Sequence, residues 1–442
     1  MQSIESIDGA ADVVRQDEPH PTTTSRVVLP RNTIPDLPPF IGWLNPIWQG
    51  FFTLLHGIAR PGDQPLFKPT NVTEVVRYLA CYSLGILLMS GIAIHWEYLM
   101  TTVQVLPPAL QLLAWIFWIY VTVIAEFVLL CGGVRVMQTT IVHEATHGKL
   151  CKDKETGRLI AEWITILLGT QPFHLYKPEH LNHHDGSAFA TLLDADARMF
   201  VDLLGFTPGQ PLDFYWRQLF KAILIPKVAI YWNLARLRQN LFEMPPAGLR
   251  WRLAAAWSLL LLRGAAVIGS SMMVGNLLPV ALYGLLWALP VWLLYPLSMT
   301  LQACSEHTWL ARRKPGEGAK LFLHRRLLNR FPFTPWTGIE NVVPFLLKVF
   351  TRDLFIRGFI LCGSLPLHGR HHTTPAESVE LWPLERYRAA DEYAKGEVTV
   401  PTYTSLLAAM ESVFLALSAL PPLNTGHKPV DHPGLQVLAI GM

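Results

Sequence analysis

Long apolar runs separated by polar intervals set the pattern of this 442-residue chain. Four of these runs are continuous enough to cross a bilayer, at about residues 78–96, 107–134, 253–275 and 279–303. A transmembrane helix needs about 20 predominantly apolar residues, because each residue adds only about 1.5 Å along the axis. We therefore predict four transmembrane helices.

Other apolar stretches are shorter or are interrupted by charge and proline. The segment 40–58 is aromatic but contains a proline, so we expect an interfacial helix there and not a span. The patches 159–170 and 218–235 are expected to form helices on or near the bilayer, and 341–367 an amphipathic helix. At 405–422 a glutamate and two terminal prolines favour an interfacial or packing role.

The composition supports a membrane protein. Hydrophobic residues make up 51% of the chain and charged residues only 16%. The net charge of +3 and the absence of a basic stripe argue against a nucleic-acid partner. We predict a cytosolic leader at 1–70 with a Pro-rich and an interfacial segment, a membrane domain at 71–375 and a cytosolic or interfacial tail at 376–442.

Lysine and arginine residues are distributed unevenly around the predicted spans. They gather before the first span, after the second, before the third and after the fourth, whereas the loop 97–106 and the turn at Gly275-Asn276 have none. The positive-inside rule therefore predicts a multi-pass protein with both termini in the cytoplasm. Two charges lie within the spans, and one hypothesis is that Glu126 and Arg263 pair across the second and third helices.

Three short histidine clusters are the strongest chemical signal. They hold eight of the 16 histidines, as His143-Glu-Ala-Thr-His147, His180-Leu-Asn-His183-His184 and His368-Gly-Arg-His371-His372. Positions i, i+3 and i+4 share a helix face, so each cluster directs its imidazoles to one side. Imidazole binds iron, zinc and copper, and eight ligands are too many for one tetrahedral zinc. The clusters predict two metal ions with open coordination positions.

The clusters are also expected on one side of the membrane. The second apolar run leads to His143 without a proline or turn, so one long helix is expected to carry the first cluster just beyond the bilayer. The charge pattern places the other two clusters on the same cytoplasmic side. The predicted fold class is all-α integral membrane, with four transmembrane helices and a cytosolic helical cap carrying the histidine clusters.

These motifs resemble the histidine boxes of the membrane fatty acid desaturases and related hydroxylases. The matching segments are His143-Glu-Ala-Thr-His147-Gly148, Tyr176-Lys177-x-x-His180-x-x-His183-His184 and His368-x-x-His371-His372-x-x-Pro375. Their order, their spacing and the four-span topology match over roughly residues 70–375, which we identify as a desaturase-type catalytic domain. Ser305-Glu306-His307 is similar to a Ser-Glu-His just after the fourth span in some of these desaturases.

The resemblance implies an O₂-dependent diiron enzyme that introduces a double bond, or a hydroxyl group, into an acyl chain. The implied iron ligands are the eight box histidines, His143, His147, His180, His183, His184, His368, His371 and His372. His307 is implied as a ninth ligand or as a group behind the ligands. Glu144, Glu179 and Glu306 are candidates to orient ligand imidazoles, as carboxylates often do. His174 lies outside the helical register of the second box.

The sequence shows no electron-transfer module. Its five cysteines include no Cys-x-x-Cys pair, and no nucleotide-binding glycine motif follows a strand. His432-Pro-Gly434 is similar to a cytochrome b5 haem motif, but too few residues follow it for such a domain. Electrons are therefore expected from a separate ferredoxin, rubredoxin or cytochrome b5, and the substrate is expected as an acyl lipid, acyl-CoA or acyl-carrier protein.

Alternative functions remain open at this point. A diiron hydroxylase or monooxygenase on an acyl, alkane or terpenoid substrate would use the same boxes, although alkane hydroxylases have an extra residue in the second box that this chain lacks. Carotenoid-type ketolases and hydroxylases share the histidine pattern. His143-Glu144-x-x-His147 is also the zinc metalloprotease motif, with Glu144 as general base, but that reading leaves two boxes unexplained. A haem-binding or metal-transport protein would not need so many ligands.

Overall fold

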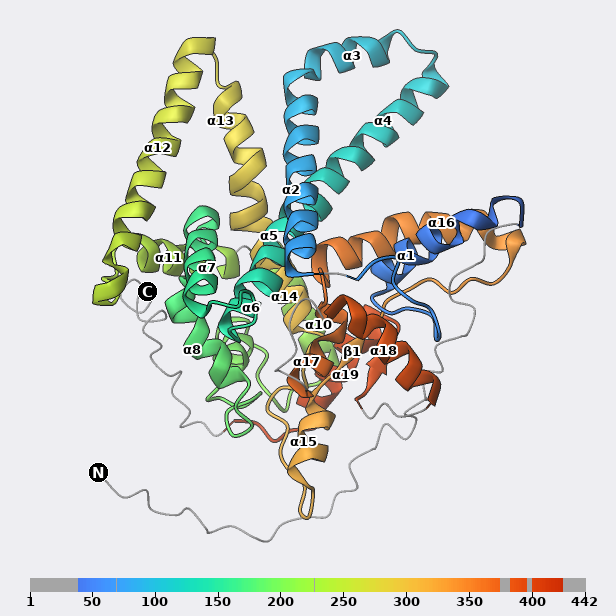
Figure 1. The fold of residues 1–442 in the computed structure, drawn as a ribbon, viewed down its shortest axis with the longest axis vertical. Helices are drawn as coiled ribbons and strands as arrows, with labels where there is room; N and C mark the ends of the chain where they lie inside the picture. The colour runs from blue at the N-terminus through green and yellow to red at the C-terminus, as the bar shows by residue number, and fades with distance from the viewer. Residues whose placement is uncertain (1–38, 69, 226, 374–381, 396–399, 424–442) are drawn as a thin grey trace.

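The computed structural model describes residues 39–68, 70–225, 227–373, 382–395 and 400–423. Within these residues the regular secondary structure is almost entirely helical. The only strands found there, β1 (Asn329–Arg330) and β2 (Thr402–Tyr403), pair in parallel over two residues each. Two helical hairpins project from one side of a helical cap (Figure 1). The predicted all-α membrane fold is confirmed.

The two hairpins contain the membrane spans. Four helices of the described residues are long and apolar enough to cross a bilayer, Asn71–Ile94, Pro108–Thr146, Ala247–Val274 and Leu278–Ala303. They coincide with the four predicted spans, and the second extends to 39 residues, which carries it into the cap. Away from the cap their apolar side chains lie open to the surroundings; Leu262 is 67% exposed and Met273 is 89% exposed. Such a surface is stable only against lipid.

Each hairpin is assembled from consecutive helical segments, several of them π-helical. The first comprises α2 (Asn71–Ile94), α3 (Trp96–Gln104), α4 (Pro108–Val123), η2 (Ile124–Cys131), α5 (Gly132–Val136), η3 (Met137–Val142) and α6 (His143–Thr146). The second comprises η5 (Ala247–Leu249), α12 (Arg250–Val274), α13 (Leu278–Tyr283), η6 (Gly284–Leu294) and α14 (Tyr295–Ala303). The segments η2, η3 and η6 are π-helical, and each wide turn rotates the helix face that follows it.

The cap is formed by shorter helices from both sides of the second hairpin. Before it come α7 (Lys154–Leu168), α8 (Phe173–His183), α9 (Ala195–Arg198), η4 (Met199–Leu203), α10 (Leu212–Leu224) and α11 (Lys227–Leu241). After it come α15 (Ala319–Arg326), η7 (Ile339–Asn341), α16 (Val342–Lys348), η8 (Val349–Asp353), η9 (Ile356–Ile360), η10 (Leu365–Leu367), α17 (His368–Thr373), α18 (Trp382–Lys395) and α19 (Leu406–Ser418). α19 buries Met410, Val413 and Phe414 and packs on α10, which is the packing role predicted for its segment.

A close backbone contact at two glycines packs the long second span against the cap. A Cβ on Gly132 would lie 2.1 Å from the carbonyl oxygen of Gly358 in η9, and a Cβ on Gly358 would lie 2.3 Å from Cγ1 of Val128. Both positions therefore require glycine, because only a residue without a side chain allows the two backbones to approach this closely. The contact fixes the segment that precedes α17 against the helix that ends in α6.

Two aromatic helices lie side by side where the spans enter the cap (Figure 1). These are α16 and α1 (Asn45–His56), which follows η1 (Pro39–Leu44). Phe52 of α1 stacks on Phe345 of α16 with ring centroids 5.7 Å apart. Their outer apolar side chains, Ile47 and Leu347 among them, remain exposed. The helices predicted in 40–58 and 341–367 are present, and their place at the bilayer surface stays a prediction.

Two details differ from what the hydrophobic pattern indicates. The loop expected at 97–106 is largely helical as α3, because no glycine or proline interrupts it before Pro107. Glu126 and Arg263 form no ion pair: Arg263 donates to the carbonyl of Leu167 at 2.6 Å and lies over the ring of Trp287. The carboxylate oxygens of Glu126 are buried without a hydrogen-bond partner.

Candidate metal centre

The first histidine box is at the end of the long second span. His143 begins α6 and His147 caps it, so the two imidazoles lie one turn apart on the same face. The helix stops there because Gly148 takes a left-handed φ of +66°, a conformation that favours glycine. The predicted continuous helix from the membrane to the first box is confirmed.

The other two boxes lie on separate cap helices. His180 and His183 are in the last turn of α8, and His184 is its C-cap. His368, His371 and His372 are three of the six residues of the short helix α17. Neighbouring residues on a helix point about 100° apart, so the double His of each box must face two directions. Each box can therefore contribute to two sites at once.

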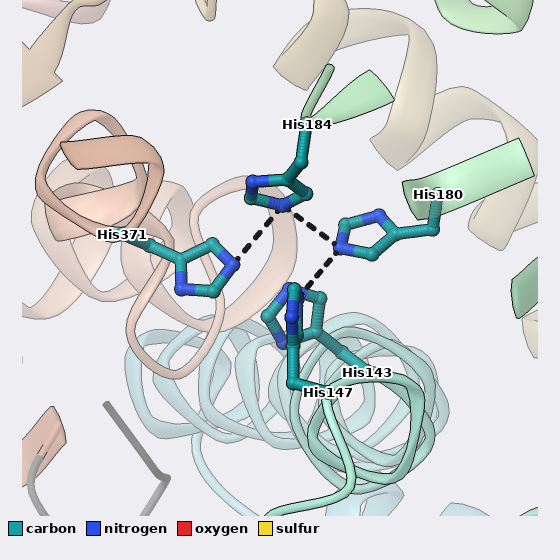
Figure 2. A group of neighbouring side chains, drawn as sticks. All are labelled: His143, His147, His180, His184 and His371. Atoms are coloured by element: carbon teal, nitrogen blue, oxygen red, sulfur yellow. Dashed lines mark hydrogen bonds between the residues drawn. The ribbon is translucent and has the colours of Figure 1, made fainter. Parts of the chain in front are cut away.

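Five imidazoles converge on a first point (Figure 2). These are His143, His147, His180, His184 and His371, whose candidate ligand nitrogens all lie within 4.8 Å of one another. Successive Nε2 atoms are 3.2 Å apart from His147 to His180, 3.0 Å from His180 to His184, and 3.2 Å from His184 to His371. Metal–imidazole bonds of about 2.0–2.1 Å put neighbouring ligand nitrogens about 3.0–3.4 Å apart. The spacing therefore fits ligands of one metal ion.

A second group forms beside the first from four buried imidazoles. These are His183, His307, His368 and His372. Nε2 of His372 lies 3.0 Å from Nε2 of His368, and the rings of His307 and His368 are 5.4 Å apart. In both the second and third boxes the i, i+4 pair joins one group while the middle histidine joins the other. His307 has no counterpart in a box and completes the second group.

The environment of His307 also indicates that this group binds a metal. Its side chain is fully buried, and neither ring nitrogen has a hydrogen-bond partner. A buried polar group without a partner costs about 1–3 kcal/mol, so such groups are rare unless something not yet counted binds them. A backbone bridge from His307 to Leu327 holds the residue in place. The donor set and the orphaned nitrogens fit a metal ion.

Carboxylates lie behind the imidazoles. Oδ2 of Asp194 lies 2.8 Å from Nδ1 of His183, and the same carboxylate caps α9. Oε1 of Glu306 lies 3.2 Å from Nε2 of His368. A carboxylate on Nδ1 fixes the tautomer of His183 and leaves its Nε2 free to bind a metal. Glu306 differs, because it lies on Nε2 of His368, the nitrogen that also faces His372.

The remaining sequence candidates lie elsewhere or have other contacts. Glu179 accepts a hydrogen bond from Gln171 at 2.6 Å, and Glu144 is fully buried in α6. His174 lies 3.5 Å from a carboxylate oxygen of Glu162 and belongs to neither group. Sequence analysis missed Asp194, which is 11 residues from His183 in sequence and is brought to it by the turn between α8 and α9.

The crowded imidazoles favour their neutral form. Burial lowers the pKa of His147 to about 4, and burial with the nearby charge of His183 lowers the pKa of His184 to about 2. His183 is the exception: burial alone would lower its pKa, but the Asp194 carboxylate raises it to about 9. Neutral imidazole is the form that binds metals, so the first group is ready to accept one near neutral pH, whereas His183 of the second group must give up a proton when a metal binds.

A cavity of about 240 Å³ opens beside both groups. His143 and His180 of the first group line it, together with His183 and His368 of the second. Aromatic and aliphatic side chains form part of its wall, and arginine, glutamine and carboxylate side chains form the rest. A molecule in this cavity would therefore lie against imidazoles of both histidine groups.

Comparison with known proteins agrees with the motifs. A family model described as "Fatty acid desaturase" matches residues 115–404, a range that contains all nine clustered histidines. The match ends beyond residue 375, so it includes α18 and β2. No curated protein and no solved structure matches the chain.

Proposed function

Because the chain belongs to the fatty acid desaturase family, we propose that it is an O₂-dependent diiron oxidoreductase that desaturates an unactivated acyl chain. The observation that supports this most is the division of nine imidazoles into one group of five and one group of four. We assign His143, His147, His180, His184 and His371 to one iron. We assign His183, His307, His368 and His372 to the other.

Two irons in these groups would supply the reduced centre that activates O₂ for attack on a C–H bond. In the overall reaction a –CH₂–CH₂– unit gives up two hydrogen atoms and becomes –CH=CH–. A separate donor supplies two electrons, two protons come from solvent, and O₂ leaves as two waters. The proposed donor is a separate ferredoxin, rubredoxin or cytochrome b5.

The chain's own residues hold the two groups at a fixed separation. His183 and His184 are adjacent in the chain but belong to different groups, so α8 links the groups directly. Asp194 orients His183, and Glu306 lies against His368. The close contact of Gly132 with η9 ties the helix of the first box to the segment that precedes the third. Imidazoles positioned in this way need little rearrangement when they bind a metal.

We further propose that the cap, both termini and the histidine groups face the cytoplasm. The support is the positive charge of the polar segments next to the cap ends of the spans. The acyl substrate would then enter as a lipid, a CoA thioester, a carrier-protein thioester or a free acid.

A zinc protease is disfavoured by the geometry. His143 and His147 lie among five imidazoles, whereas a catalytic zinc takes three protein ligands and leaves one position open. A hydroxylase would use the same ligands and differ only in whether the substrate radical loses a second hydrogen or gains oxygen. The ligand geometry therefore favours diiron chemistry, and the product decides between its two outcomes.

Product analysis under ¹⁸O₂ tests this proposal. Cells that express the protein should contain new unsaturated acyl chains without ¹⁸O, and cells that express His372→Ala should contain none. His324→Ala is the matched control, because His324 lies on α15 outside both groups, and it should keep full activity. Acyl products that carry ¹⁸O would show a hydroxylase, and unchanged lipids with a fully metal-loaded protein would contradict acyl oxidation altogether.

A further inference from the structure

Two buried arginines line the cavity. Arg135 belongs to α5, in the long second span, and Arg236 belongs to α11 in the cap. Their side chains are 1% and 8% exposed, respectively. The Arg135 guanidinium carbon lies 5.2 Å from the ring centroid of Tyr295, and that of Arg236 lies 4.7 Å from the same centroid. Two cations therefore share one aromatic ring beside the cavity.

Neither arginine has a carboxylate partner among the described residues. Arg135 donates to the side-chain oxygen of Gln302, and its Nε has no acceptor. Nη1 of Arg236 is also buried without an acceptor. Burial lowers the pKa of Arg236, and the neighbouring charge of Arg135 lowers it further. A buried cation is costly unless an anion pairs with it, so two together indicate a missing anion.

The carboxylates that line the same cavity have other partners. Asp194 binds His183, Glu306 lies on His368 and accepts from Gln302, and Glu179 accepts from Gln171. Asp196 lies 3.6 Å from Nδ1 of His183. These carboxylates therefore have partners of their own, and Glu306 is linked to Arg135 only through the side chain of Gln302, so neither arginine is paired with a carboxylate directly.

We propose that Arg135 and Arg236 bind the carboxylate of a non-esterified substrate acid. A guanidinium binds a carboxylate through charge-assisted hydrogen bonds, and each of these two arginines has one nitrogen without an acceptor. An ester or thioester carbonyl carries no charge and would leave both cations unpaired. The substrate of this enzyme is therefore a free carboxylic acid, and this statement about the substrate rests on the proposed function.

Arg135 and the first histidine box lie at different levels of the same helix. Arg135 precedes His143 by eight residues in one continuous helix, a rise of about 12 Å. Met199, Leu203 and Met299 line the cavity as well, and they suit an alkyl segment. An acid anchored by its carboxylate would present carbons several bonds away to the histidine groups.

Equilibrium binding without turnover tests the carboxylate site. The probes are dodecanoate, methyl dodecanoate and dodecyl phosphate, titrated calorimetrically into detergent-solubilised, iron-loaded protein without O₂ or reductant. Dodecanoate should bind at least ten-fold more tightly than its methyl ester, because only the acid pairs with the arginines. Equal affinity for acid and ester would overturn the proposal without any variant, and tighter binding of the phosphate would show an anion site of another kind and also overturn it.

Variants of the two arginines test whether these residues cause the preference for the acid over the ester. Arg236→Gln and Arg135→Gln should each remove the preference for the acid, and Arg236→Lys should retain part of it because the charge remains but the planar fork is lost. Arg238→Gln is the matched control, since Arg238 lies on the same helix, is partly exposed and pairs with Glu243. A preference retained in both glutamine variants would overturn the proposal.

The same titration separates this inference from the proposed function. Preferential binding of dodecanoate that depends on the arginines, in a protein that yields no unsaturated product with O₂ and a reduced donor, would support the carboxylate site and count against the desaturase reaction. Desaturation of acyl chains only as thioesters or lipids, with no preference for the free acid in binding, would support the reaction and overturn the carboxylate site.

Discussion

Replacing His307 by Phe should have opposite effects on the metal-free and the iron-loaded protein. In the metal-free chain the imidazole of His307 is buried, and neither of its nitrogens has a hydrogen-bond partner. Its ring centroid lies 4.8 Å from that of Phe189 and 5.0 Å from that of Trp309. Phenylalanine removes those two polar atoms, which is worth about 1–3 kcal/mol of relief. Replacing one aromatic ring by another of similar size costs less than about 1.5 kcal/mol of packing energy. The metal-free variant should therefore be as stable as the wild type or more stable.

The iron-loaded protein should respond in the other direction. With His307 replaced, the second group keeps three imidazoles, His183, His368 and His372. Metal that binds only the folded state stabilises it in proportion to its affinity, so a weaker site gives a smaller stabilisation. Thermal unfolding of each protein with and without iron, together with iron analysis, measures the effect. The difference in unfolding temperature between the iron-loaded and the metal-free form should be smaller in the variant than in the wild type. The iron content should fall towards one iron per chain.

His56→Phe is the matched control for this experiment. His56 is also buried, has an unpartnered Nε2 and lies 5.3 Å from both Phe52 and Phe333, but it belongs to neither histidine group. Its replacement should change both forms equally and leave the iron content unchanged. Loss of more than about 3 kcal/mol in metal-free His307→Phe, with two irons retained, would refute the assignment of His307 as a ligand.

Three further predictions address the support of the site and the topology. Asp194→Asn should lower metal affinity about 10- to 100-fold, as measured by chelator competition, because His183 loses the carboxylate that orients it. Gly132→Ala should destabilise the protein by about 1–3 kcal/mol in thermal unfolding, because the new methyl group meets the carbonyl oxygen of Gly358; an unchanged midpoint would contradict the close contact. Single cysteines in the 97–106 segment and at 312–320 should label from opposite sides of the membrane, and labelling from one side would refute the proposed orientation.

The spans and the histidine boxes were predictable because both are local signals. Apolar runs of sufficient length determine which helices cross the membrane, and the i, i+4 spacing of His143 and His147 determines that they share a face. The uninterrupted run before His143 also showed that the first box would lie at the end of a span. These features depend on neighbours in the chain and on no other part of the fold.

The division of the boxes between two groups was not predictable in the same way. His183 and His184 belong to different groups because of how α8 is rotated against α6 and α17, and only the packed fold determines that rotation. The π-helical turns before His143 alter the helix face in a way that sequence periodicity does not reveal. For the same reason Asp194 was missed, and the hypothesis that Arg263 pairs with Glu126 is wrong, because Arg263 donates to the carbonyl of Leu167.

The iron content of the anaerobically purified protein tests the central claim most directly. Eight box histidines and His307 in two groups predict two irons per chain. His147→Ala, His184→Ala and His372→Ala should each lower the iron content and abolish activity, because every box supplies ligands to the same pair of metals. One zinc per chain without iron, together with an active His372→Ala variant, would contradict the diiron assignment.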